Sequence, residues 1–192
     1  MLQQNITKEE LNELPLNAFE GEIEIVDTPL QAEKAVAYLS QFEVLGFDTE
    51  TKPSFKKGQI NRVALLQLSS GEKAFLFRLQ KLELPLNVRQ LLACSSIKKV
   101  GVAIRDDIKT LQKISYFEPD GFVELQEKVK AYGISAFSLK KIAGIVLGIR
   151  ISKSQRLSNW ESEILTGAQQ SYAATDAWVS YQIYYSLINK KS

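Results

Sequence analysis

Three short segments of the sequence carry oxygen-donor side chains at spacings that regular secondary structure would gather on one face. In the first, Asp48 and Glu50 follow the apolar residues 44–47 with one residue between them, so a strand would place both carboxylates on the same face. Two like charges about 7 Å apart along a strand repel each other, and a cation bound between them would offset that repulsion. A strand end that frays into solvent is the alternative for this pair.

The second segment, IRDDIKTL, has the apolar pattern of a helix. Ile104, Ile108 and Leu111 fall at i, i+4 and i+7, and Asp107 lies within that apolar stripe, three residues from Ile104 and four from Leu111. Asp106 points away from the stripe. The alternative is that both residues are ordinary helix N-terminal acids, stabilised by the helix dipole. The spacing nominates Asp107 as the functional residue of the two.

The third segment is the long apolar and aromatic stretch near the C-terminus. Its helical periodicity places Tyr172, Asp176, Val179, Ile183 and Leu187 on one stripe. A carboxylate on a buried stripe needs a partner, and Tyr172 lies one turn before Asp176 on the same face. A tyrosine–aspartate hydrogen bond within the core is the alternative for this pair taken alone.

The composition narrows the chemistry that these residues could perform. The chain has no histidine and one cysteine, Cys94, which excludes histidine-based catalytic triads, zinc sites built on histidine or several cysteines, and an intrachain disulfide. Carboxylate oxygens favour Mg²⁺ or Mn²⁺ over zinc. Two such ions about 3.5–4 Å apart are the usual arrangement for in-line attack on a phosphodiester. The residue types therefore indicate metal-assisted phosphodiester chemistry.

Apolar periodicity and capping signals indicate the elements that must position these side chains. Strands are expected over 22–26, 44–50, 62–69, 73–77 and 98–103, with a hairpin turn at Ser70 and Gly71 and an extended segment near 122–125. Helices are expected from a capping box at Thr7 to Pro15, and over 28–40, 86–93, 105–115, 124–132, 138–147 and 163–189. This order predicts a mixed α/β fold, with an N-terminal extension carrying a short helix (1–20) and a single domain (21–192).

Overall charge and hydrophobicity are those of an ordinary globular protein. The 192 residues include 24 Lys and Arg against 22 Asp and Glu, so any basic surface for nucleic acid must be local. No apolar stretch approaches the roughly 18 residues needed to cross a bilayer, and residues 1–20 lack the pattern of a secretory signal. We therefore expect a soluble, cytoplasmic protein with no membrane partner.

Three segments together resemble the motifs of a known enzyme family. They are FDTETKPSF (47–55), VGVAIRDDIKTL (100–111) and SNWESEILTGAQQSYAATDAWVSYQIY (158–184), with FSLKKIAGIVLG (137–148) between the last two. They are similar to the three exonuclease motifs of the DEDDy 3′–5′ exonucleases, a superfamily that includes RNase D, the Werner syndrome exonuclease domain and the proofreading domains of DNA polymerases. The resemblance covers residues 23–187 and implies an RNase H-like (DnaQ-like) fold, in which helices flank a mixed central sheet.

The resemblance also implies a role for each acidic residue. Asp48 and Glu50 match the first motif, Asp107 the second and Asp176 the third, and Tyr172 occupies the tyrosine position that defines the subclass. By analogy with the family, Asp48 would bridge two Mg²⁺ or Mn²⁺ ions, Glu50 and Asp176 would complete the shell of one ion, and Asp107 would bind the other mainly through water. Tyr172 would orient the attacking water, with partial base character. The implied activity is hydrolysis of phosphodiester bonds from the 3′ end, which releases nucleoside 5′-monophosphates.

Two basic loops are candidates for substrate binding. The loop over 51–62 interleaves basic side chains with an aromatic ring, which suits a phosphate backbone and a stacked terminal base. Its candidate residues are Lys52, Phe55, Lys56, Lys57 and Arg62. The loop over 150–160 holds Arg150, Lys153, Arg156 and Trp160. A solvated loop is the alternative for the lysines, and a packing role is the alternative for Trp160.

The expected substrates are single-stranded or recessed 3′ ends of DNA or RNA, because a metal clamp reads the phosphate and the strand end more than the sugar. We expect targeting or processivity to require a protein partner, since no helicase motif or helical RNA-binding extension fits in 192 residues. Two other functions compete with this interpretation. One is a catalytically silent nucleic-acid-binding domain on the same fold, and the other is a phosphatase or phosphodiesterase that acts on a small nucleotide.

Overall fold

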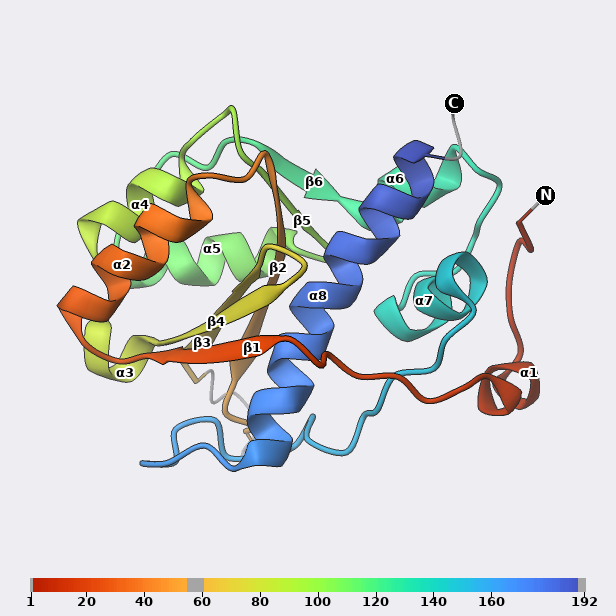
Figure 1. Cartoon of the computed structure of the whole chain (residues 1–192), viewed down its shortest axis with the longest axis horizontal. Helices are drawn as coiled ribbons and strands as arrows, with labels where there is room; N and C mark the ends of the chain where they lie inside the picture. Colours follow the sequence, from red (N-terminus) through yellow and green to blue (C-terminus); the bar gives the residue numbers. More distant parts are fainter. Residues whose placement is uncertain (1, 55–60, 190–192) are drawn as a thin grey trace.

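Six strands form one mixed sheet at the centre of the computed structural model, which describes residues 2–54 and 61–189 (Figure 1). The strands are β1 (Glu22–Val26), β2 (Val44–Thr51), β3 (Val63–Ser69), β4 (Lys73–Arg78), β5 (Lys98–Gly101) and β6 (Phe122–Glu124), in the spatial order β1-β4-β3-β2-β5-β6. β3 runs antiparallel to β2 and β4, whereas the β1–β4, β2–β5 and β5–β6 pairs are parallel. β2 thus lies in the interior of the sheet, between β3 and β5.

Helices cover both faces of this sheet. They are α1 (Lys8–Glu13), α2 (Pro29–Leu39), α3 (Leu79–Leu82), α4 (Leu86–Leu92), α5 (Arg105–Ile114), α6 (Leu125–Lys130), α7 (Leu139–Leu147) and α8 (Gly167–Asn189). α2, α4 and α5 pack on one face, and the long helix α8 crosses the other, with α6 and α7 beside it (Figure 1). Among the described residues, no helix combines the length and apolar character needed to cross a membrane.

The alternation of strand side chains divides the apolar interior into cores on the two sides of the sheet. On β2, Leu45 and Phe47 join the core beneath α2, α4 and α5, whereas Val44 joins the core beneath α6, α7 and α8. Phe47 is fully buried and meets the ring of Phe122 edge to face, with 5.2 Å between the ring centroids. Side chains of β2 therefore contribute to the apolar cores beneath both layers of helices.

The predicted mixed α/β architecture is confirmed, with differences at the ends of elements. α8 begins at Gly167 rather than near 163, because the Thr166 hydroxyl accepts a hydrogen bond from the Gln169 N–H and the Gln169 side chain accepts one from the Thr166 N–H. β5 ends at Gly101, two residues earlier than expected. The short helix α3, which directly follows β4, was not predicted.

Residues of the N-terminal segment pack into the apolar core that lies beneath α6, α7 and α8. Ile6 and Leu11 are buried there, and α1 lies against α7 at Gly144, where a β-carbon would come within 2.6 Å of Leu11 Cδ1. Further along, the Phe19 N–H donates to the Thr175 hydroxyl of α8 at 3.0 Å. The segment before β1 thus reaches α7 and α8 through specific contacts.

Candidate active site

The contact between β2 and α8 brings the first and third acidic segments together. Asp48 and Glu50 alternate with Phe47 and Thr49 along β2, so both carboxylates face α8. Gly46, two residues before Asp48, has no side chain, and a β-carbon there would lie 1.9 Å from the Ala177 carbonyl oxygen. The glycine therefore permits the close approach of α8, which carries Asp176 to the end of β2.

Three carboxylates meet at this contact. Oxygen atoms of Asp48, Glu50 and Asp176 all lie within 4.8 Å of one another, and Asp176 is only 8% exposed. The donor set contains oxygen alone, without nitrogen or sulfur, which matches the preference of hard divalent cations such as Mg²⁺ and Mn²⁺. These residues of the chain could therefore hold a divalent metal ion.

The electrostatics of the three carboxylates show how strongly they repel one another without a cation. Burial, followed by the neighbouring charges of Asp176, Glu50 and Asp107, raises the pKa of Asp48 well above its usual value. Burial, with the same repulsion from Asp176 and Asp107, raises the pKa of Glu50 to about 8. Burial also raises the pKa of Asp176 to about 7, against the opposing effects of the Tyr172 hydroxyl and Lys153. A bound cation would remove this repulsion.

Asp107 reaches the same region from the other layer of helices. Its Oδ1 accepts a hydrogen bond of 2.5 Å from the Thr49 hydroxyl, so it lies beside β2 but apart from the group of three carboxylates. Burial raises its pKa, although the hydrogen bond from Thr49 lowers it. Asp106 instead points into solvent, where its carboxylate lies 3.1 Å from Lys109 Nζ and its side chain is 90% exposed. The two adjacent acids are therefore in the orientations that the helical spacing predicts.

Glu124, at the end of β6, holds the beginning of α5 and was missed by the sequence analysis. Its two carboxylate oxygens accept hydrogen bonds from the N–H groups of Ala103 and Ile104, each at 2.9 Å. Ala103 has φ of 61°, in the left-handed region that a residue with a β-carbon rarely adopts. Glu124 therefore fixes the turn that aims Asp107 at β2, and the carboxylate that ends the FVE strand was its sequence signal.

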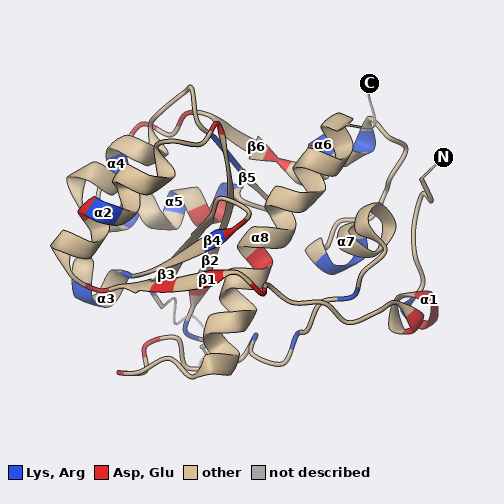
Figure 2. Cartoon of the chain, in the orientation of Figure 1, with Lys and Arg blue, Asp and Glu red and all other residues tan. Residues whose placement is uncertain are grey.

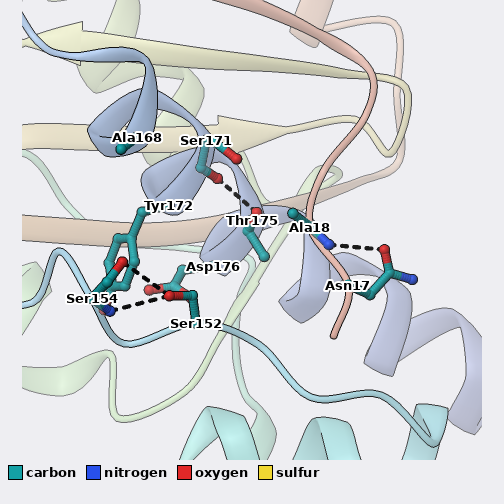
Figure 3. Close-up of a pocket in the computed structure, with 9 residues that line it drawn as sticks. All are labelled: Asn17, Ala18, Ser152, Ser154, Ala168, Ser171, Tyr172, Thr175 and Asp176. Carbon is teal, nitrogen blue, oxygen red and sulfur yellow. Dashed lines mark hydrogen bonds between the residues drawn. The ribbon is translucent and has the colours of Figure 1, made fainter. Parts of the chain in front are cut away.

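Tyr172 lies next to Asp176 at the rim of a cavity of about 200 Å³ (Figure 3). Hydroxyl side chains that line the cavity include Ser152, Ser154, Ser171 and Thr175. Burial, and then the negative charges of Asp176, Glu50 and Asp48, raise the pKa of Tyr172 far above its usual value of 10. Without a metal its hydroxyl is therefore a neutral group beside the Asp176 carboxylate.

The predicted substrate-binding residues of the 51–62 loop differ in their surroundings in the structure. Lys52 forms an ion pair with Glu161 at 3.0 Å. Phe55, Lys56 and Lys57 lie outside the described residues. Arg62 is exposed and lines a cavity of about 210 Å³ together with Thr110 and Lys113 of α5. Of this group, Arg62 remains a candidate for phosphate contact.

In the loop over 150–160, the structure corrects the prediction for one of the candidate substrate-binding residues. Arg156 is exposed and remains available to a ligand. Trp160, by contrast, has no exposed surface and packs against the Tyr172 ring, with 5.9 Å between the centroids. An indole without accessible surface does not contact a substrate, so the expectation of substrate binding by Trp160 is wrong and the packing alternative is correct. Trp160 supports the tyrosine instead.

The proteins that are similar to this chain are described as 3′-5′ exonucleases. The sequence profile of the 3′-5′ exonuclease family matches residues 23–191. The chain is 37% identical over 188 residues to the mouse bifunctional 3′-5′ exonuclease/ATP-dependent helicase WRN, and 30% identical over 163 residues to a putative 3′-5′ exonuclease of Acanthamoeba polyphaga mimivirus. These matches cover 92% and 76% of this chain, but only 13% and 40% of the two relatives. The chain thus spans a minor part of each relative's length.

Solved structures agree in fold. The Nibbler EXO domain of Aedes aegypti superposes with a TM-score of 0.80 at 21% identity, covering 91% of this chain and 92% of that one. Escherichia coli RNase D gives a TM-score of 0.79 at 20% identity, covering 88% of this chain and 45% of that one. The fold is therefore RNase H-like, as expected. Given the profile match over most of its length, the chain belongs to the family of 3′-5′ exonucleases, which are hydrolases.

Proposed function

We propose that this chain is a 3′–5′ exonuclease of the DEDDy type, which removes nucleotides from the 3′ end of a nucleic acid and releases nucleoside 5′-monophosphates with the help of two divalent ions. The observation that carries the proposal is the convergence of Asp48, Glu50 and Asp176 within 4.8 Å of one another, with Tyr172 next to Asp176 on the lining of the same cavity. No carboxylate expected from the three motifs is missing. This argues against a catalytically silent nucleic-acid-binding domain.

The acidic side chains account for the binding of the ions. Asp48, Glu50 and Asp176 would hold one divalent ion, and Asp107, held beside β2 by Thr49, would serve a second. When bound, the ions would lower the pKa of the attacking water and stabilise negative charge on the departing 3′ oxygen. Mg²⁺ and Mn²⁺ both suit an all-oxygen donor set. The raised pKa values of Glu50 and Asp176 mean that protons would compete with the ions at and below neutral pH.

Tyr172 has a separate role in this proposal. Because its pKa lies far above neutrality in the metal-free protein, it would act through its hydroxyl group as a hydrogen-bonding partner that orients water. Base character would require the ions to lower its pKa. Trp160 packs against the ring on one side and keeps it from rotating away from Asp176. The ring is thereby positioned in advance of substrate binding.

The names of two relatives support the substrate class that we propose. The mouse relative is named as an exonuclease and helicase, and a Trypanosoma brucei RNase D of the same fold has been solved with RNA U12 (TM-score 0.80, 21% identity). Single-stranded or recessed 3′ ends of DNA or RNA are accordingly the substrates that we propose. Targeting to particular strands would come from a protein partner.

The decisive experiment uses 5′-labelled single-stranded DNA, recessed duplex DNA and RNA with Mg²⁺, Mn²⁺ or EDTA. We expect products shortened one nucleotide at a time from the 3′ end, 5′-monophosphates in the supernatant and no reaction in EDTA. Asp48→Asn, purified identically, controls for contaminating nucleases. Binding without cleavage by the unmodified chain would favour the silent domain, and faster cleavage of a dinucleotide than of a long strand would favour a small-nucleotide phosphodiesterase.

A further inference from the structure

A group of basic side chains lies beside the candidate active site, on elements that are distant in sequence. Lys8 belongs to α1, Lys140 to α7, and Arg150 and Lys153 to the loop between α7 and α8. Figure 2 shows blue bands on α7 and along the loop that leads from it toward α8. Burial, and then the charges of Lys153, Arg150 and Lys8, lower the pKa of Lys140, so Lys140 lies close to the other three cations. We call them the α7 basic surface.

The cations of this surface lack the carboxylate partners found elsewhere on the molecule. Lys52, Lys73, Lys81, Lys109 and Lys130 each form an ion pair with Asp or Glu. Within residues 2–54 and 61–189, none of the four cations of the α7 basic surface takes part in such a pair. The charges that shift the pKa of Lys140 are all positive. Like charges gathered without counter-charges are electrostatically unfavourable, and an anionic ligand would offset that cost.

The backbone around Arg150 gives this surface a fixed frame. The Arg150 N–H donates to the Pro15 carbonyl at 2.9 Å, and the Arg150 carbonyl accepts from the Asn17 N–H at 2.9 Å. Its Nε also donates to the Leu14 carbonyl at 3.2 Å. The guanidinium is therefore held by the N-terminal segment, while its terminal nitrogens, which donate to no group within residues 2–54 and 61–189, could form the paired hydrogen bonds that phosphate accepts.

The surface is continuous with the catalytic residues. Ser152 and Ser154, on either side of Lys153, line the same cavity as Tyr172 and Asp176, and Figure 3 shows their hydroxyl groups turned toward these two side chains. A strand whose 3′ end reached Asp176 through this cavity would therefore meet Lys153, which lies between the two lining serines, first, and then Arg150 and Lys140.

From this placement we propose that the α7 basic surface binds the phosphates of the substrate strand next to its 3′-terminal nucleotide. The inference rests on the proposed function, because it needs a strand end at the carboxylates. It assigns the path of the strand next to its 3′ end to α7, α1 and the 150–154 loop.

The test compares Lys140→Gln/Lys153→Gln with Lys34→Gln. Lys34 is an exposed lysine of α2 on the opposite side of the sheet, which makes it a matched control. All three proteins, including the unsubstituted one, carry Asp48→Asn so that the strand is not degraded. Fluorescence anisotropy of a labelled single strand of about 20 nucleotides is followed between about 0.05 and 0.2 M salt. Glutamine retains most of the stem of each lysine, so the fold should be kept.

We expect the double variant to bind on the order of tenfold more weakly at 0.1 M salt, and its plot of log affinity against log salt to be shallower by about 1.4, since each phosphate contact on a single strand contributes about 0.7. Lys34→Gln should match the unsubstituted protein. An unchanged affinity and slope in the double variant would overturn the proposal. Arg150→Lys, which keeps the charge but loses the paired hydrogen bonds, should weaken binding with little change in slope.

A second measurement separates this proposal from the proposed function. With Asp48 restored and Mg²⁺ or Mn²⁺ present, Lys140→Gln alone should degrade the long strand with a higher KM while hydrolysing a dinucleotide at the unsubstituted rate, because a dinucleotide has no further phosphates. Hydrolysis of neither substrate by the unsubstituted chain would refute the nuclease function while leaving the binding result intact. Equal loss of both activities in Lys140→Gln would refute the strand path alone.

Discussion

The two faces of strand β2 are built from alternate residues and have opposite energetics. On one face Leu45 and Phe47 are fully buried among apolar side chains, and their removal from water stabilises the fold. On the other face Asp48 and Glu50 crowd against Asp176, and their raised pKa values record the cost of charging them there. One strand thus contributes stability through Leu45 and Phe47 and carries the acidic side chains Asp48 and Glu50 on its other face.

The largest expected effects contrast these two faces directly. Asp48→Asn or Asp176→Ala should reduce nuclease activity to background, because each removes a ligand for the ions, yet each should keep or raise the melting temperature in EDTA by relieving repulsion. Phe47→Ala should do the reverse, lowering the free energy of unfolding by about 3–5 kcal/mol. Thermal denaturation and a labelled-strand assay measure both quantities. Full activity in either aspartate variant would refute the metal-site interpretation.

The second prediction compares two adjacent carboxylates on α5. Asp107→Asn should strongly impair hydrolysis, because Asp107 lies beside β2 within hydrogen-bonding distance of Thr49. Asp106→Asn should leave the rate within a few-fold, because its carboxylate is exposed and forms a surface ion pair with Lys109. Steady-state rates with Mg²⁺ and Mn²⁺ test the pair. Greater sensitivity of Asp106 would show that the second motif has been assigned to the wrong residue.

The third prediction isolates the hydroxyl group of Tyr172. Tyr172→Phe keeps the ring and its contact with Trp160, so the melting temperature should change little. The rate should fall by about 10²–10⁴-fold, the usual range for a group that orients or deprotonates water, with strand affinity nearly unchanged. Higher pH should restore part of the loss, because hydroxide then needs no protein group. Turnover equal to that of the unsubstituted chain would make Tyr172 a packing residue only.

Patterns along single elements correctly predicted which acidic side chains share a face. The alternation along β2 and the helical stripe through Tyr172 and Asp176 each fix which side chains share a face, because both periods are set by the backbone. The separation of Asp107 from Asp106 follows from the same geometry. These predictions needed no knowledge of which elements pack together.

Contacts between distant segments were not predictable in this way. That Gly46 admits the Ala177 carbonyl, that Glu124 holds the turn before α5 and that Trp160 is buried behind Tyr172 depend on the packing of one element on another. The nearness of Lys8 to Lys140 likewise depends on the docking of α1 on α7, about 130 residues away in sequence. The periodicity of one element does not indicate which distant element will pack against it.

The smallest expected effect is a dependence of stability on pH that arises from the acidic face alone. In the metal-free protein, burial and mutual repulsion raise the pKa of Glu50 from 4.5 to about 8, and burial raises that of Asp176 from 3.8 to about 7. Between about pH 4 and pH 8 the folded chain therefore holds more protons than the unfolded chain. The free energy of unfolding should consequently fall as the pH rises through this window.

This sign distinguishes the site from ordinary surface carboxylates, whose ion pairs lower the pKa and make stability rise with pH. In EDTA, the melting temperature should drop by several degrees between about pH 5 and pH 8, since about 1 kcal/mol shifts it by 2–4 °C in a chain of this size. Glu50→Gln should flatten the profile, and Phe47→Ala should lower it equally at every pH. Saturating Mg²⁺ or Mn²⁺ should reverse the slope, because the ions bind only the ionised carboxylates. A metal-free profile that rises with pH would mean that the two faces of β2 do not differ in the way proposed.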